Sequence, residues 1–83
     1  MLDQIIESYP DEELLIADGF DKAIIGVDEK SMRLIYSVSK CLEIIIIDSQ
    51  SGMSYEEAIE YFEFNVSGSY MGEKTPIWCY DYF

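Results

Sequence analysis

Short stretches of apolar residues with two different periodicities follow one another along the first half of the chain. Residues 2–9 carry apolar side chains at helical spacing, and Pro10 keeps the predicted helix short because it disfavours helical geometry at the residue before it. Residues 23–27 and 32–36 are rich in β-branched side chains and flank a polar stretch. This arrangement predicts a β-hairpin, with residues 28–31 as its turn.

Two places in this half are less regular. Residues 11–17 begin with three acids and end in four apolar residues, a pattern that fits either another helical turn or a short strand. Gly26 interrupts the first predicted strand, and a glycine in a strand indicates a β-bulge or an early end of the strand. The pattern alone leaves both alternatives open.

Residues 37–48 contain four consecutive isoleucines, which favour a strand by propensity. The spacing of other features favours a helix, because Ser37 and Ser39 both suit the N-cap position and four residues recur at helical intervals: Cys41, Ile44, Ile45 and Asp48. We predict a helix for this segment.

A capping box, Ser54-Tyr55-Glu56-Glu57, predicts the start of a second main helix. Its apolar face consists of Ala58, Ile59, Phe62 and Val66, and its acidic face of Glu56, Glu60 and Glu63. Residues 65–68 are expected to end or loosen the helix. Further along, Gly72 and Pro76 bracket a turn, and residues 77–80 are predicted to form an edge strand because proline cannot donate to a ladder.

The predicted order of elements is therefore (α)-β-β-α-α-β. We expect an α+β fold with a small antiparallel sheet, formed by the hairpin and the C-terminal strand and packed by two main helices. With 83 residues the chain has room for one domain, residues 1–83.

Charge changes the picture more than any motif. Seventeen Asp and Glu residues face five Lys and Arg residues and no histidine, which gives a net charge of −12. Such a surface repels nucleic acids and anionic membranes and attracts basic partners, so we expect no direct nucleic-acid or membrane binding. The longest apolar run, residues 44–47, is far below the roughly 18 residues of a membrane span. Asp3 and Glu7 occupy the place of a basic signal-peptide region, so we expect a cytoplasmic protein.

The residues that usually carry catalysis are scarce. Without histidine, neither a zinc site nor a paired nucleophile and base can be assembled from Cys41 and Cys79, and we expect both to be small core residues. No calcium loop or phosphate-binding loop occurs. We therefore expect a non-enzymatic protein without a metal or cofactor.

Two groups of residues are candidates for binding a partner. Glu56, Glu60 and Glu63 would form a row of charges along one helix edge, as phosphates do along a nucleic-acid strand; ordinary solvation is the alternative. Aromatic residues gather near the C-terminus, where interface contacts and core packing are both open: Tyr70, Trp78, Tyr80, Tyr82 and Phe83. Strand alternation would place Trp78, Tyr80 and Tyr82 on one side, with Trp78 expected in the core and Tyr82 and Phe83 at an interface.

Four stretches, FDKAIIG, KCLEI, GMSYEEAIEYFEFNV and GEKTPIW, resemble a family of small, acidic, uncharacterised bacteriophage and prophage proteins. The resemblance covers residues 20–78 and leaves outside it an N-terminal arm, residues 1–19, and an aromatic tail, residues 79–83. It implies a phage origin and assigns no catalytic or binding residues.

Together, charge and resemblance lead to one functional expectation. The protein would be a phage-encoded accessory protein that binds and inhibits a host protein with a basic surface, as anti-restriction or anti-CRISPR proteins do, through an acidic and nucleic-acid-mimicking surface. The alternative is a homo-oligomeric structural or assembly protein without a host target. In that case residues 77–80 would pair with a second copy in a homodimer.

Overall fold

The structure, a computed structural model, describes residues 1–48, 52–68 and 72–82. Its elements follow the predicted order of an α+β fold. They are α1 (Leu2–Ser8), the 3₁₀ turn η1 (Asp21–Ala23), β1 (Ile24–Asp28), β2 (Arg33–Ser37), α2 (Val38–Asp48), α3 (Tyr55–Phe62), the π-helix η2 (Glu63–Ser67) and β3 (Ile77–Cys79). The isoleucine run is helical, which confirms the prediction from spacing over the one from propensity.

The sheet has the strand order β1-β2-β3, so β3 is an edge strand as predicted. β1 and β2 form the predicted antiparallel hairpin, and its register shifts between Ile24 and Gly26, which confirms a β-bulge. The prediction of an all-antiparallel sheet is wrong, because β3 pairs with β2 in the parallel direction.

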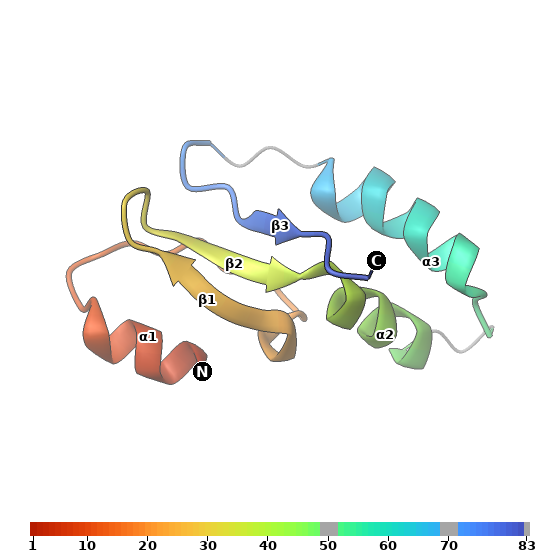
Figure 1. Cartoon of the computed structure of the whole chain (residues 1–83), viewed down its shortest axis with the longest axis horizontal. Helices are drawn as coiled ribbons and strands as arrows, with labels where there is room; N and C mark the ends of the chain where they lie inside the picture. The colour runs from red at the N-terminus through yellow and green to blue at the C-terminus, as the bar shows by residue number, and fades with distance from the viewer. Residues whose placement is uncertain (49–51, 69–71, 83) are drawn as a thin grey trace.

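The path of the chain explains the parallel strand. β2 leads directly into α2, and α3 then runs back in the opposite direction toward the hairpin turn (Figure 1). β3 therefore starts near the beginning of β2 and runs alongside it. A parallel pair needs such a long crossover, whereas the expectation of an antiparallel strand ignored the two changes of direction between β2 and β3.

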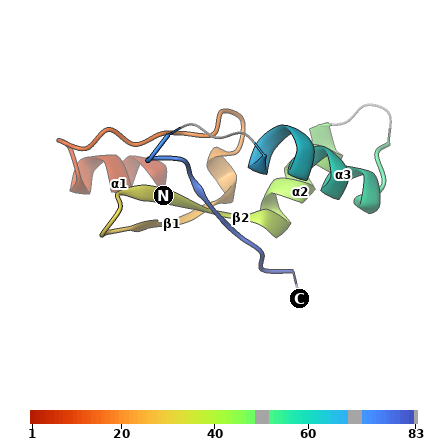
Figure 2. The same cartoon turned by 90° about the horizontal axis from the view of Figure 1, so that it is seen from above.

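The helices cover the sheet unevenly. α2 and α3 lie side by side beyond the end of β2 (Figure 1), whereas α1 and the chain after it lie over one face of the hairpin (Figure 2). Residues 11–17 form neither a helical turn nor a strand. They are held to the sheet by the backbone N–H of Ala17, which donates to the hydroxyl of the fully buried Tyr36 at 2.7 Å. Burial raises the pKa of Tyr36.

The core joins the hairpin to both main helices. Leu34 and Tyr36 of β2 are fully buried, and Trp78 of β3 lies beside Tyr36 in register, with ring centroids 5.1 Å apart. Trp78 also meets Phe62 of α3 edge to face at 5.3 Å. Phe62 is 1% exposed, so this stack fixes α3 against the sheet.

Both main helices begin at serine caps, as predicted. The buried Ser37 hydroxyl accepts the Lys40 backbone N–H at 3.2 Å and caps α2. α2 turns Cys41, Leu42 and Ile45 into the core, and its packing overrides the strand propensity of isoleucine. No helix in the described part of the chain has the length and apolar composition needed to cross a membrane.

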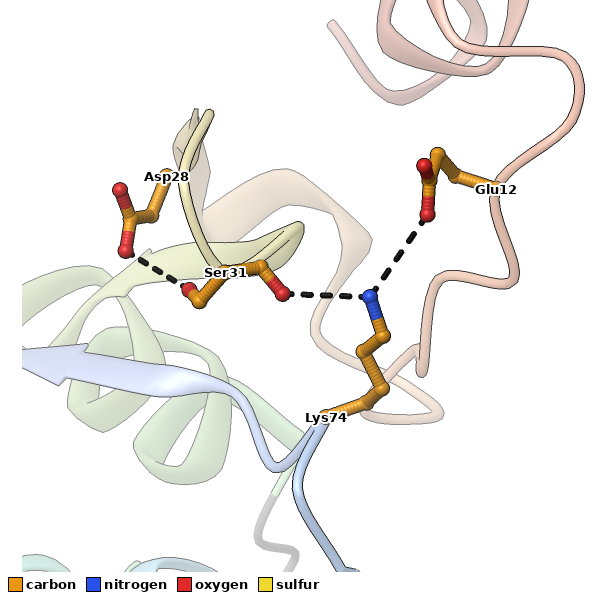
Figure 3. Close-up of polar contacts among 4 residues, drawn as sticks. All are labelled: Glu12, Asp28, Ser31 and Lys74. Carbon is orange, nitrogen blue, oxygen red and sulfur yellow. Dashed lines mark hydrogen bonds and ion pairs between the residues drawn. The ribbon is translucent and has the colours of Figure 1, made fainter.

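At the far end of the hairpin, one lysine connects three segments (Figure 3). The ammonium group of Lys74 donates to the Ser31 carbonyl at 3.1 Å and lies 3.6 Å from the Glu12 carboxylate. The Ser31 hydroxyl in turn donates to Asp28 at 2.7 Å, which closes the hairpin turn and lowers the pKa of Asp28. The N-terminal arm, the hairpin turn and the approach to β3 are thus held together by polar contacts.

Candidate protein-binding surface

A capping box begins α3. The Ser54 hydroxyl accepts the Glu57 backbone N–H, and the Glu57 carboxylate accepts the Ser54 backbone N–H, each at 3.2 Å. The helix starts at Tyr55, as the sequence predicts. The apolar positions decide which side of α3 faces the core, and Ala58 and Phe62 are buried there.

The predicted acidic stripe lies on the opposite edge of α3 and continues into the first residue of η2. Its members Glu56, Glu60 and Glu63 are all exposed. Residues 55–67 contain four glutamates and no lysine or arginine. Within the described residues, no ion pair reaches the stripe. Three uncompensated carboxylates one helical turn apart produce a local negative potential that a cationic partner would relieve.

An exposed phenylalanine that the sequence prediction missed lies beside the stripe. Phe64 is 85% exposed and shares a hollow on the surface with Glu60 and Glu63. It belongs to η2, where the Asn65 amide donates to the Tyr61 carbonyl at 3.2 Å and Ser67 to the Glu63 carbonyl at 3.4 Å. Such bonds from side chains to the backbone compete with the regular helical ladder. Phe64 could have been found, because it follows Glu60 by four residues and so falls on the acidic edge.

The C-terminal aromatic residues run along α3 on the side next to the stripe. Tyr80 packs edge to face against Phe62 at 6.4 Å, and Tyr82 against Tyr55 at 6.3 Å. Together with the contact between Trp78 and Phe62, these pairs place the three alternating aromatics on one side of the tail, as expected. Tyr70 and Phe83 lie outside the described residues.

These aromatics differ in exposure. Trp78 is half-buried between Tyr36 and Phe62, and its indole N–H has no hydrogen-bond partner among the described residues. Tyr80 is 38% exposed and Tyr82 is half-buried. Loss of hydration raises the pKa of Tyr82, and the neighbouring Tyr80 and Glu63 raise it further.

Asp81 holds this tail in place from its other side. Its carboxylate accepts the Ser37 hydroxyl at 2.6 Å and the Ser39 backbone N–H at 3.0 Å, both at the first turn of α2. The hydrogen bond from Ser37, followed by that from Ser39, lowers the pKa of Asp81. A carboxylate at the positive end of a helix is favourable, so the tail is fastened to α2 while its aromatic rings face α3.

The described residues contain no group of side chains suited to a metal ion, and one of the two thiols is deeply buried. Nowhere in these parts of the chain do three or more Cys, Asp or Glu side chains gather closely enough to hold a metal ion. Cys41 is fully buried, and burial raises the pKa of its thiol to about 12, so it remains protonated at neutral pH. Cys79 is half-buried in β3.

We name this surface the acidic aromatic face: Glu56, Glu60, Glu63, Phe64, Tyr80 and Tyr82. It combines three of the predicted acids and two of the predicted aromatics with Phe64. Trp78 is left out because it packs, half-buried, against the core. In comparisons with protein-family models, curated proteins and solved structures, nothing matched this chain.

Proposed function

We propose that the protein acts by binding a basic protein partner through the acidic aromatic face. The observation that carries this proposal is the row of exposed carboxylates Glu56, Glu60 and Glu63 beside the 85% exposed ring of Phe64. Fold stability gives no reason to expose a ring of this size. Interface hot spots commonly combine an aromatic anchor with polar surroundings that are desolvated on binding.

The charges and the ring would have separate roles. The carboxylates steer a cationic surface toward α3 and accelerate association, an effect that weakens with salt. Phe64 then provides apolar contact area, and Tyr80 and Tyr82 add more where the tail packs on Phe62 and Tyr55. Because carboxylates along one helix edge resemble a row of phosphates, the partner we propose is a nucleic-acid-binding protein whose Lys and Arg residues line its binding groove.

We extend the proposal to the biological class that the resemblance of residues 20–78 to phage proteins supports. In this form the protein is an inhibitor of a host defence protein of the restriction or CRISPR type, and it competes with nucleic acid for the same groove. Inhibition of this kind is stoichiometric and needs no catalytic residue.

Capture of partners from a host lysate, with elution by a salt gradient and identification by mass spectrometry, tests the proposal. The test variant is Glu56→Gln/Glu60→Gln/Glu63→Gln, and its matched control is Asp3→Asn/Glu7→Gln/Asp11→Asn, which neutralises three exposed acids elsewhere. Both have a net charge of −9, since −12 + 3 = −9. We expect the test variant to lose a nucleic-acid-binding partner that the control retains. If both variants lost the partner equally, net charge alone would explain the effect, which would contradict the proposal.

The face of the sheet that carries Ile25, Ile35 and Ile77 favours one alternative function, that of a homo-oligomeric assembly protein. Ile25 is 38% exposed there, and Ile35 and Ile77 pair in register beside it, both half-buried. A second copy could cover this apolar strip. Light scattering on the wild type and on Ile25→Lys distinguishes the inhibitor from the assembly protein. A wild-type dimer that Ile25→Lys dissociates, together with no host protein captured from the lysate, favours the assembly protein.

A further inference from the structure

A groove between α2 and the turn at residues 18–21 has an apolar floor and an acidic rim. Its floor is formed by Phe20, Ile44 and Met53, and its rim by Asp18, Asp21 and Asp48. Two neighbouring hollows of about 360 and 340 Å³ make up the groove, and they share Gly19, Ile44 and Asp48. We name it the acid-rimmed groove. The shared residues Ile44 and Asp48 lie on α2, so the two hollows adjoin there.

The groove is distinct from the acidic aromatic face. It lies between α2 and the turn at residues 18–21, and from α3 only Tyr61 lines it. Tyr61 is 46% exposed and follows Glu60 by one residue, so the two side chains are about 100° apart around the helix. A ligand of the groove therefore does not need to touch the acidic stripe.

Charge and apolar exposure together identify the kind of occupant. Three carboxylates and one lysine, Lys22, surround the hollows, for a local charge of −2. Ile47, which lines the second hollow, is 79% exposed, an unusual exposure for an isoleucine in a helix that otherwise packs into the core. Apolar contacts in the hollows combined with cations at the rim suit a segment that is both apolar and basic.

We infer that the acid-rimmed groove binds a basic amphipathic helix of a protein partner. Such a helix presents apolar side chains one turn apart, which would enter the two adjoining hollows on either side of Ile44. Its Lys and Arg residues would flank this apolar stripe and face Asp18, Asp21 and Asp48. This inference goes beyond the proposed function, because it assigns a second surface and a defined secondary structure to what binds there.

The test uses a synthetic helical peptide of about 15 residues with leucines on one face and lysines on the other. A control peptide keeps the lysines and replaces the leucines by glutamine. We expect the leucine peptide to bind the full chain in calorimetry and to shift the NMR signals of Ile44, Ile47 and Met53. Equal binding of the glutamine peptide, or shifts centred on Glu56, Glu60 and Glu63, would overturn the inference.

Exposed positions allow variants that leave the fold intact. Ile47→Lys places a positive charge in the groove and should weaken the leucine peptide by at least about tenfold, because it removes an apolar contact and repels the lysines. Asp48→Asn should weaken it about two- to fivefold. The matched controls are Ile6→Lys on α1 and Glu43→Gln on α2, both exposed and outside the groove, and each should change binding less than about twofold.

The same experiment separates this inference from the proposed function. Glu56→Gln/Glu60→Gln/Glu63→Gln should bind the leucine peptide as the wild type does, even though we expect it to lose the captured partner. If Ile6→Lys and Glu43→Gln weaken the peptide as much as the groove variants do, the peptide senses only the overall charge and the groove is not its site.

Discussion

The hairpin-turn end and the α3 end of this molecule lie at opposite ends of its long axis and carry their negative charge in different surroundings (Figure 1). At the hairpin turn, Asp28 accepts hydrogen bonds from Ser31 and Lys30, and Glu12 lies 3.6 Å from Lys74. Along α3, Glu56, Glu60 and Glu63 have no cation nearby in sequence. Acids at the first end are part of the fold, whereas those at the second are exposed without a compensating charge.

This difference separates charge that holds the fold together from charge available to a partner. A net charge of −12 on 83 residues states only that acids are in excess. Three of the five cations, Lys30, Arg33 and Lys74, lie in or beside the hairpin turn and its contacts. The excess is therefore concentrated away from them, and the exposed acidic stripe is where mutations should change binding without changing stability.

The largest expected effect contrasts two phenylalanines two residues apart, Phe62 at the end of α3 and Phe64 in η2. Phe62→Ala removes the buried ring that contacts both Trp78 and Tyr80, and we expect the free energy of unfolding to fall by about 3–5 kcal/mol. Phe64→Ala changes a ring that is 85% exposed, so stability should change by less than about 0.5 kcal/mol while partner capture is lost. Urea denaturation measures the first effect and the salt-gradient capture the second.

Because Phe62→Ala removes much of the stability of a small domain, Phe62→Leu provides a milder variant, with an expected loss of about 1.5 kcal/mol. A comparable loss of stability in Phe64→Ala would show that its ring belongs to the core and would break the distinction between the two residues.

The sequence predicted those parts of the fold that local chemistry decides. The capping box at Ser54 and the helix across the isoleucine run follow from neighbouring residues, and the structure confirms them. At Gly26 the sequence left a bulge and an early strand end open, and the register shift shows the bulge. The direction of β3 could not be predicted in this way, since it depends on two reversals of the chain in space. The Asp81 cap on α2 joins residues 42 positions apart, a distance that no local pattern describes.

Local patterns also predicted only part of the candidate surface. Helical spacing was enough to place Glu56, Glu60 and Glu63 on one exposed edge. It was not enough to separate Trp78, which is stacked in the core, from Tyr80, which is 38% exposed, because alternation along a strand gives the side but not the depth of a residue. Phe64 was missed because an aromatic residue in a helix usually faces the core.

A smaller effect is expected from the N-cap of α3. Ser54→Ala removes the acceptor for the Glu57 N–H and should lower the free energy of unfolding by about 1 kcal/mol. Ser54→Asp keeps a capping oxygen and should retain most of the stability. Urea denaturation measures both variants, and amide exchange should show faster opening in the first turn of α3. A loss in Ser54→Asp equal to that in Ser54→Ala would contradict the capping explanation.

Acidification should affect Asp28 at the hairpin end and Asp81 beside α2 in the same direction. Hydrogen bonds lower the pKa of both, from Ser31 and from Ser37 respectively, so the folded state binds protons less readily than the unfolded state. Their contribution to stability is therefore present above the unfolded pKa of about 3.9 and is lost as the pH falls through the lower folded values. Thermal unfolding between about pH 2 and 5 should show a shallower acid slope in Asp28→Asn and Asp81→Asn, and slopes equal to that of the wild type would contradict it.

The smallest expected effect comes from the contact that most visibly ties the hairpin end together. Lys74→Gln removes the ion pair with Glu12, but both side chains are well exposed, at 37% and 43%, and exposed pairs are screened by water and salt. We expect the free energy of unfolding to fall by about 0.5 kcal/mol or less in urea denaturation, with Lys22→Gln as the control for a lost positive charge. A loss above about 2 kcal/mol would mean that the arm depends on this lysine. In that case the ion pair between Lys74 and Glu12, rather than the buried hydrogen bond between Ala17 and Tyr36, would hold the arm to the hairpin. Acids at the hairpin end would then contribute to stability more than packing does.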